Sequence, residues 1–112
     1  MIIRDRYELE RENAQVLNLV QAMLGGVSSN LRGVSIECWD AGVRLHFLLE
    51  YDSEEEREEC DDIAFEFEAL QSIGLNVEVR VVVSMDRWAQ SRLPGRRVFG
   101  RKEPAVSEEG GA

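Results

Sequence analysis

The alternation of apolar and polar residues around one short turn constrains the fold of this chain more than any other feature. The runs VSIECW and VRLHFLLEY each place an apolar residue at every second position, and Asp40-Ala41-Gly42 separates them. Alternation with a period of two is typical of a β-strand with one buried face, so the two runs predict a β-hairpin. The residues expected on its buried face are Val34, Ile36, Cys38, Val43, Leu45, Phe47, Leu49 and Tyr51.

Two other segments carry the apolar spacing of three and four residues that predicts an amphipathic helix. The first is RYELERENAQVLNLVQAMLGG, which we expect to end at Gly25 and Gly26 because glycine adopts the left-handed geometry of a helix stop. The second is expected from Ser53 to Ser72, with Asp52 and Ser53 as N-cap candidates. The predicted core residues are Val16, Leu19, Val20, Met23 and Leu24 in the first helix and Cys60, Ile63, Ala64, Phe67 and Leu70 in the second.

The remaining apolar runs predict a third strand and a short fourth strand. LNVEVRVVVS would place Leu75, Val77, Val79, Val81 and Val83 toward the core, and GRRVFGRKEP contributes Val98 and Phe99. The order α-β-β-α-β(-β) predicts an α+β domain over residues 1–103, with an antiparallel sheet of three to four strands and two helices packed on one face. Residues 104–112 have little to bury, and this tail is predicted to be disordered.

The second face of the predicted sheet is expected to lie open to solvent. It would be mainly polar, with a few apolar members. Its residues would be Glu37, Trp39, Arg44, His46, Leu48, Glu50, Glu78, Arg80 and Val82.

The net charge of −9 at pH 7 is concentrated in one segment. Residues 52–70 carry ten acids and one cation, whereas the rest of the chain carries twelve acids and twelve cations. An acidic surface repels the phosphate backbone and attracts basic proteins, so we expect a protein partner and no nucleic acid.

One aromatic residue lies among these acids on the predicted helix. Phe65 points about 160° away from the core residue Ile63, into the acidic arc. An aromatic side chain surrounded by carboxylates is typical of an interface anchor. The predicted partner-binding residues are therefore Glu58, Asp61, Asp62, Phe65, Glu66 and Glu68.

Two structural interpretations of the acidic helix stay open beside this one. A Glu-rich helix face is commonly no more than a solvated surface. Alternatively, Phe65 could pack under the carboxy-terminal segment, with Arg96, Arg97 and Arg101 neutralising the acids from within the chain.

No motif predicts catalysis, a cofactor or a metal site. The acidic run lacks the glycine turn and the spaced aspartates of a calcium loop. His46, the only histidine, is expected on the open sheet face without a nucleophile beside it. Cys38 and Cys60 form neither a CxxC motif nor a Cys/His group, and we expect both to be buried, reduced thiols.

The apolar runs are too short to place the chain in a membrane. None approaches the ~20 residues of a membrane span, and acids and arginine interrupt the first residues where a secretory signal would lie. We therefore expect a cytoplasmic protein without a membrane partner.

The chain resembles the bacterial immunity proteins that are encoded beside contact-dependent growth-inhibition toxins and other polymorphic toxins. The resemblance is carried by LNLVQAMLGGVSSNLRGVSIE, by VRLHFLLE, by the acidic lead into DIAFEFEALQ and by LPGRRVFGRKEP, and covers most of residues 14 to 104. It implies a non-catalytic protein that binds its cognate toxin domain in the cytosol and covers its active or substrate-binding surface. Nuclease toxins are often basic because they bind phosphates, and an acidic helix suits such a target.

A second class of function also fits the sequence. The chain could be a small acidic regulatory or scaffold protein that self-associates through its open sheet face or a strand edge, with the acidic helix serving solubility. In either class we expect a monomer or a weak homodimer.

Overall fold

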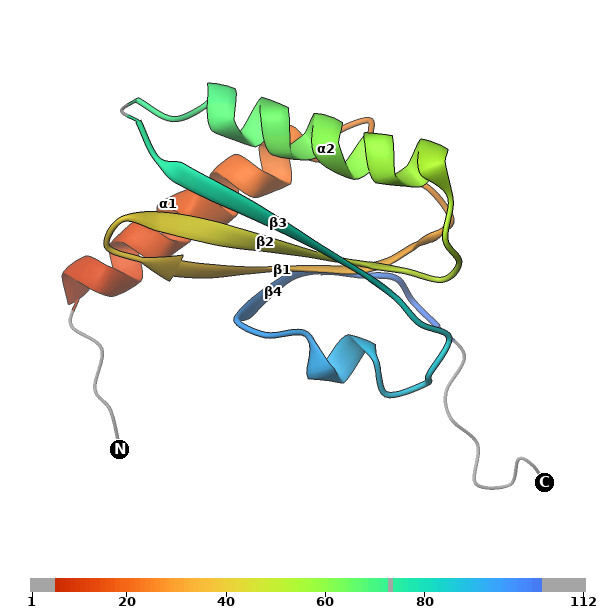
Figure 1. Cartoon of the computed structure of the whole chain (residues 1–112). Coiled ribbons are helices and arrows are strands. Elements are labelled where there is room, and N and C mark those ends of the chain that lie inside the picture. Colours follow the sequence, from red (N-terminus) through yellow and green to blue (C-terminus); the bar gives the residue numbers. More distant parts are fainter. Residues whose placement is uncertain (1–5, 73, 104–112) are drawn as a thin grey trace.

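The computed structural model describes residues 6–72 and 74–103, in which two helices pack on one face of a four-stranded sheet (Figure 1). In chain order the elements are α1 (Arg6–Ala22), β1 (Leu31–Trp39), β2 (Gly42–Leu49), α2 (Glu54–Ala69), β3 (Asn76–Val83), a 3-10 helix (Gln90–Arg92) and β4 (Arg96–Gly100). The predicted α+β class and element order are confirmed. The disordered tail predicted for residues 104–112 lies outside the described residues.

The sheet is mixed, so the prediction of a wholly antiparallel sheet is wrong. The strand order is β3-β2-β1-β4, in which β1 is antiparallel to both β2 and β4, whereas β2 and β3 are parallel. The cause is α2, which carries the chain from the end of β2 back to the beginning of β3. The two strands consequently run in the same direction, as in any β-α-β unit.

The predicted hairpin of β1 and β2 is confirmed, with Val34 opposite Phe47 and Ile36 opposite Leu45. Glycine is required at the first residue of β2 by a close approach from β3. A Cβ atom on Gly42 would lie 2.3 Å from the carbonyl oxygen of Asn76. The prediction that glycine ends the first helix is also confirmed, since Gly25 has a φ of 84°.

The core lies between the two helices and the sheet, and all of its buried residues except Ala22 and Leu31 are among those predicted from the sequence. Its buried members are Leu19, Ala22, Met23, Leu31, Val34, Ile36, Val43, Leu45, Phe47, Leu49, Cys60, Ile63, Ala64 and Phe67. Burial of this apolar surface is the main driving force for the fold.

Five residues predicted for the core are exposed. Tyr51 and Leu70 lie beyond the last residues of β2 and α2, and Val83 is the last residue of β3. The other two are Val20 and Leu24, which fall outside the stripe that α1 buries. Cys38 is half-buried, so the prediction that both thiols are buried holds only for Cys60.

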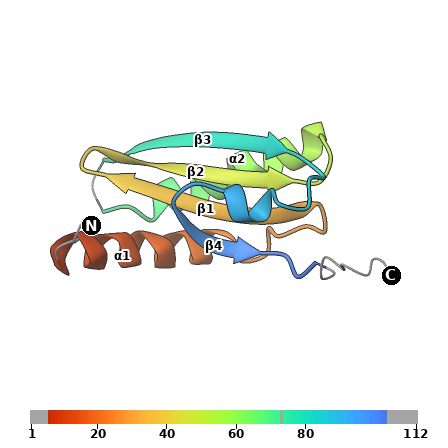
Figure 2. The same cartoon turned by 90° about the horizontal axis from the view of Figure 1, so that it is seen from below.

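The sheet face opposite the helices is covered at one end, so the prediction of an open face is only partly right. Residues 84–95, which include the 3-10 helix, cross this face (Figure 2). The Ser35 hydroxyl donates a hydrogen bond to the carbonyl oxygen of Pro94, and the Gln90 side chain donates to the carbonyl oxygen of Arg32. His46 and Leu48, both expected to be open, are buried in consequence.

Candidate functional site

The exposed side of α2 carries the residues that the sequence singled out. The helix begins at its N-cap Ser53, whose hydroxyl accepts a hydrogen bond from the amide of Glu56, and it buries Cys60, Ile63, Ala64 and Phe67 against the sheet. Because that stripe faces inward, the six predicted residues all point to solvent. We call these six the acidic surface: Glu58, Asp61, Asp62, Phe65, Glu66 and Glu68.

Phe65 is the one large apolar side chain of this surface. Its side chain is 69% exposed, as predicted from its position on the helix. The interpretation in which the carboxy-terminal segment covers Phe65 is therefore wrong.

The arginines of the carboxy-terminal segment do not neutralise the acidic surface. Arg96 pairs with Glu12 of α1 at 3.3 Å, and Arg101 pairs with Glu50 at 2.9 Å and with Glu103 at 3.0 Å. Within residues 6–72 and 74–103, no ion pair joins a cation to a carboxylate of the acidic surface.

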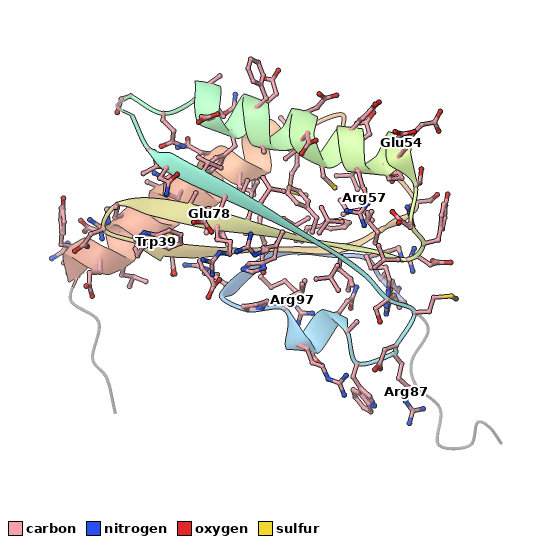
Figure 3. The ribbon with its side chains drawn as sticks, viewed as in Figure 1. Trp39, Glu54, Arg57, Glu78, Arg87 and Arg97 are labelled. Atoms are coloured by element: carbon pink, nitrogen blue, oxygen red, sulfur yellow. The ribbon has the colours of Figure 1, made fainter. Side chains whose placement is uncertain are left out.

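The single arginine of α2 also leaves the acidic surface uncompensated. Arg57 reaches back to Asp52 before the helix, at 2.7 Å, and its hydrogen bond is the first cause that lowers the pKa of Asp52. Figure 3 shows Glu54 and Arg57 in the first turns of α2. The carboxylates further along the helix thus keep their charge facing solvent.

A groove that the sequence did not reveal lies beside the acidic surface. It has a volume of about 360 Å³ and separates the end of α1 from α2. Three carboxylates of α2 form one wall, and Leu24, which is 75% exposed, stands on the other. Its lining residues are Gln21, Ala22, Leu24, Gly25, Gly26, Glu59, Asp62, Ile63 and Glu66. The available signal was Gly25, whose φ of 84° ends α1 at this point and turns the chain beside α2.

The open end of the sheet carries a balanced ion-pair network. The Arg44 guanidinium lies 2.9 Å from Glu78 and 3.4 Å from Glu37, and it stacks 5.4 Å from the ring centroid of Trp39. His46 Nε2 lies 2.7 Å from a carboxylate oxygen of Glu37, which lowers the pKa of Glu37. His46, predicted to lie on the open sheet face, is thus a buried residue held by a carboxylate. Cations and acids alternate on the surface around it.

The described residues hold no arrangement that suggests chemistry. No three His, Cys, Asp or Glu side chains among residues 6–72 and 74–103 could together hold a metal ion. Neither cysteine forms a disulfide in the described structure, and burial raises the pKa of Cys60 to about 12, so that this thiol is protonated and unreactive at neutral pH. No helix in the described ranges combines the length and apolar character needed to cross a membrane.

An exposed aromatic side chain among carboxylates, on a small α+β fold, is a feature typical of protein-binding surfaces. Comparison with known protein families identifies the kind of protein. The chain belongs to the MafI2 immunity protein family, whose sequence profile matches residues 12–103. Among curated proteins no sequence matches the chain. The predicted resemblance to immunity proteins of polymorphic toxin systems is therefore confirmed, and a cognate toxin is the partner that the family implies.

Proposed function

We propose that the protein neutralises its cognate toxin by placing the acidic surface of α2 over a basic, substrate-binding surface of the toxin. The observation that carries this proposal is the coincidence of charge and exposure. Residues 52–70 hold ten acids and one cation, and the acids of the acidic surface have no cation paired with them in the described chain. A basic target would supply the missing counter-charges.

Phe65 would anchor the complex. A structural helix gains little from a side chain of this size in water, whereas an aromatic side chain that enters a pocket of a partner is a frequent hot spot. The surrounding carboxylates would act over a longer range, by steering a basic partner and accelerating association. The groove beside α2 would bind an arginine or lysine of the toxin, because the apolar Leu24 suits the long stem of such a side chain and the acidic wall suits its charged end.

This mode of action requires no chemistry from the immunity protein itself. A nuclease is the toxin class that best fits an acidic inhibitor, since a nuclease must hold phosphates with cations.

We further propose that the protein acts in the cytoplasm of the cell that makes the toxin, within a contact-dependent growth-inhibition or related delivery system.

The test measures binding kinetics to the toxin domain encoded beside this protein. Phe65→Ala is expected to speed dissociation and weaken binding by ~2 kcal/mol or more, about 30-fold. A triple variant, Glu58→Gln with Asp62→Asn and Glu66→Gln, is expected to slow association and to flatten its dependence on salt.

Matched controls remove the same groups elsewhere. Trp88→Ala truncates an exposed aromatic residue outside α2, and the triple variant Glu8→Gln, Glu10→Gln and Asp40→Asn removes three exposed charges outside α2. Both controls should bind like the wild type. The proposal fails if Phe65→Ala and the α2 triple variant both bind like the wild type and the association rate does not depend on salt. A loss of affinity in the control that carries Asp40→Asn would also contradict it and would place the binding surface near Trp39.

A further inference from the structure

The outer edge of β3 is a free strand edge. In the described part of the chain β3 pairs only with β2, which leaves its other side without a neighbouring strand. The amide of Asn76 donates to Ala41 at 3.3 Å and that of Ser84 to Leu49 at 3.0 Å, both on the β2 side. Backbone groups alternate in direction along a strand, so the odd-numbered residues of β3 direct their N–H and C=O groups outward. These residues are Val77, Val79, Val81 and Val83.

The strand at the opposite edge of the sheet, β4, is protected against pairing with a further strand, whereas β3 is not. β4 has five residues, a register irregularity opposite β1 and two arginines, of which Arg96 is tied to Glu12 and Asn13 of α1. Short length, bulges and charges are the devices that block pairing at an edge. β3 is longer, has an uninterrupted register with β2, and is mostly valine.

The sequence of β3 is complementary to itself when read in the opposite direction. In Val77-Glu78-Val79-Arg80-Val81, a two-fold axis at Val79 places each Glu78 opposite Arg80 of a second copy and each Val77 opposite Val81. In antiparallel pairs, opposite charges facing each other stabilise and like charges destabilise. An axis one residue away would set Glu78 opposite Glu78 or Arg80 opposite Arg80.

Hydrogen-bond direction fits the same register. With the axis at Val79, the outward groups of Val77, Val79 and Val81 face one another and can form about six backbone hydrogen bonds. Glu78 and Arg80 lie on the other sheet face, where Arg80 is 57% exposed and stands 3.7 Å from Glu78 of its own strand. A second copy would offer Arg80 a carboxylate directly across the strands.

We infer that two copies of the protein pair through the outer edges of β3, antiparallel and with the two-fold axis at Val79, to form one continuous eight-stranded sheet. The backbone hydrogen bonds and the Glu78–Arg80 pairs of this pairing use only residues of β3, so the inference does not rest on the proposed function. Each copy carries a net charge of −9, so mutual repulsion opposes dimer formation at low ionic strength. Added salt should therefore strengthen self-association, whereas it should weaken binding to a basic toxin.

The inference can be tested by sedimentation equilibrium of the purified wild type and of two charge-reversal variants. Arg80→Glu and Glu78→Arg should each be monomeric where the wild type is a dimer, because like charges then face across the axis. An equimolar mixture of the two variants should associate again, since each Glu then faces an Arg. A wild type that stays monomeric up to millimolar concentration, or a mixture of folded variants that does not associate, overturns the inference.

A disulfide test keeps the inference falsifiable if Glu78→Arg, which faces Arg44, does not fold. Val79→Cys places two thiols at a facing hydrogen-bonded pair, where Cα atoms lie about 5.5 Å apart and a disulfide can form. Mild oxidation should link Val79→Cys into a covalent dimer much faster than Val83→Cys, which carries the same native cysteines but faces Leu75. Equal rates for the two variants would exclude the proposed axis.

Discussion

The two faces of the sheet are covered in different ways, although the same strands build both. Toward the helices the strands present a continuous apolar layer, and α1 and α2 cover it with further apolar residues. On the other face residues 84–95 cover one end only, and polar contacts hold them. One face therefore depends on apolar area and the other on directed hydrogen bonds.

The covered end of the second face holds the buried side chain of Arg32, the second residue of β1. The side chain is 4% exposed, and its guanidinium donates to both carboxylate oxygens of Glu103, at 2.7 and 2.8 Å. It also donates to the carbonyl oxygens of Ser84 and Asp86, at 2.7 and 3.1 Å. Arg32 in β1 thus ties the end of β3 and the segment after β4 together. A segment held largely through its backbone can thus cover part of a sheet when a buried charge binds its carbonyl oxygens.

The largest effect should come from the face toward the helices. Phe47→Ala leaves a cavity in the core and is expected to lower the free energy of unfolding by about 4 kcal/mol. Phe65→Ala is the matched control, because the same truncation at an exposed site should change stability by less than about 0.5 kcal/mol. Urea unfolding followed by circular dichroism measures both. Similar losses for the two variants would mean that Phe65 is packed in solution.

The second largest effect is expected on the sheet face that residues 84–95 cover. Glu103→Gln keeps the shape of the side chain but leaves the buried Arg32 without a counter-charge, and we expect a loss of about 3 kcal/mol in the free energy of unfolding. Glu58→Gln, on the acidic surface, serves as the control and should be nearly neutral. A loss below about 0.5 kcal/mol for Glu103→Gln would show that apolar contacts hold residues 84–95.

Acid should reproduce this effect in the wild type. The hydrogen bond from Arg32 lowers the pKa of Glu103 below its usual 4.5. A lowered folded pKa stabilises the protein above pH 4.5, and this contribution is lost as the pH falls through the folded pKa. The stability difference between the wild type and Glu103→Gln should therefore be largest near neutral pH and shrink below about pH 4.5. A constant difference from pH 7 to pH 3 would contradict the assignment of the ion pair.

The two faces also differ in how far the sequence predicts them. Strand alternation and helical spacing identified the core side, since each pattern states directly which residues face inward. The cover of the other face has no such pattern: Gln90 binds backbone carbonyl oxygens, which every residue carries. The parallel pairing of β3 could have been foreseen from the strand-helix-strand order around α2.

The candidate site was likewise predicted only in part from the sequence. The helical spacing correctly predicted that Phe65 is exposed, but it also placed Leu70, which is exposed, in the core. The groove between α1 and α2 depends on how two helices pack, and Leu24 was expected inside the core. Periodicity thus locates the residues of one element, but it does not show which surfaces of two elements meet.

The smallest effect isolates one hydrogen bond between the sheet and its polar cover. The Ser35 hydroxyl is buried and donates to the carbonyl oxygen of Pro94, so Ser35→Ala should lower the free energy of unfolding by about 1 kcal/mol. Ser91→Ala is the control, because its hydroxyl donates to the carbonyl oxygen of Trp88 at 2.8 Å on an exposed turn, where water can replace the bond. Hydrogen exchange of the amides of β1 and residues 84–95 should show faster exchange on both sides of the contact for Ser35→Ala alone. If both serine variants behave alike, residues 84–95 do not depend on this hydrogen bond, and the contacts of Arg32, Glu103 and Gln90 must hold them on the sheet.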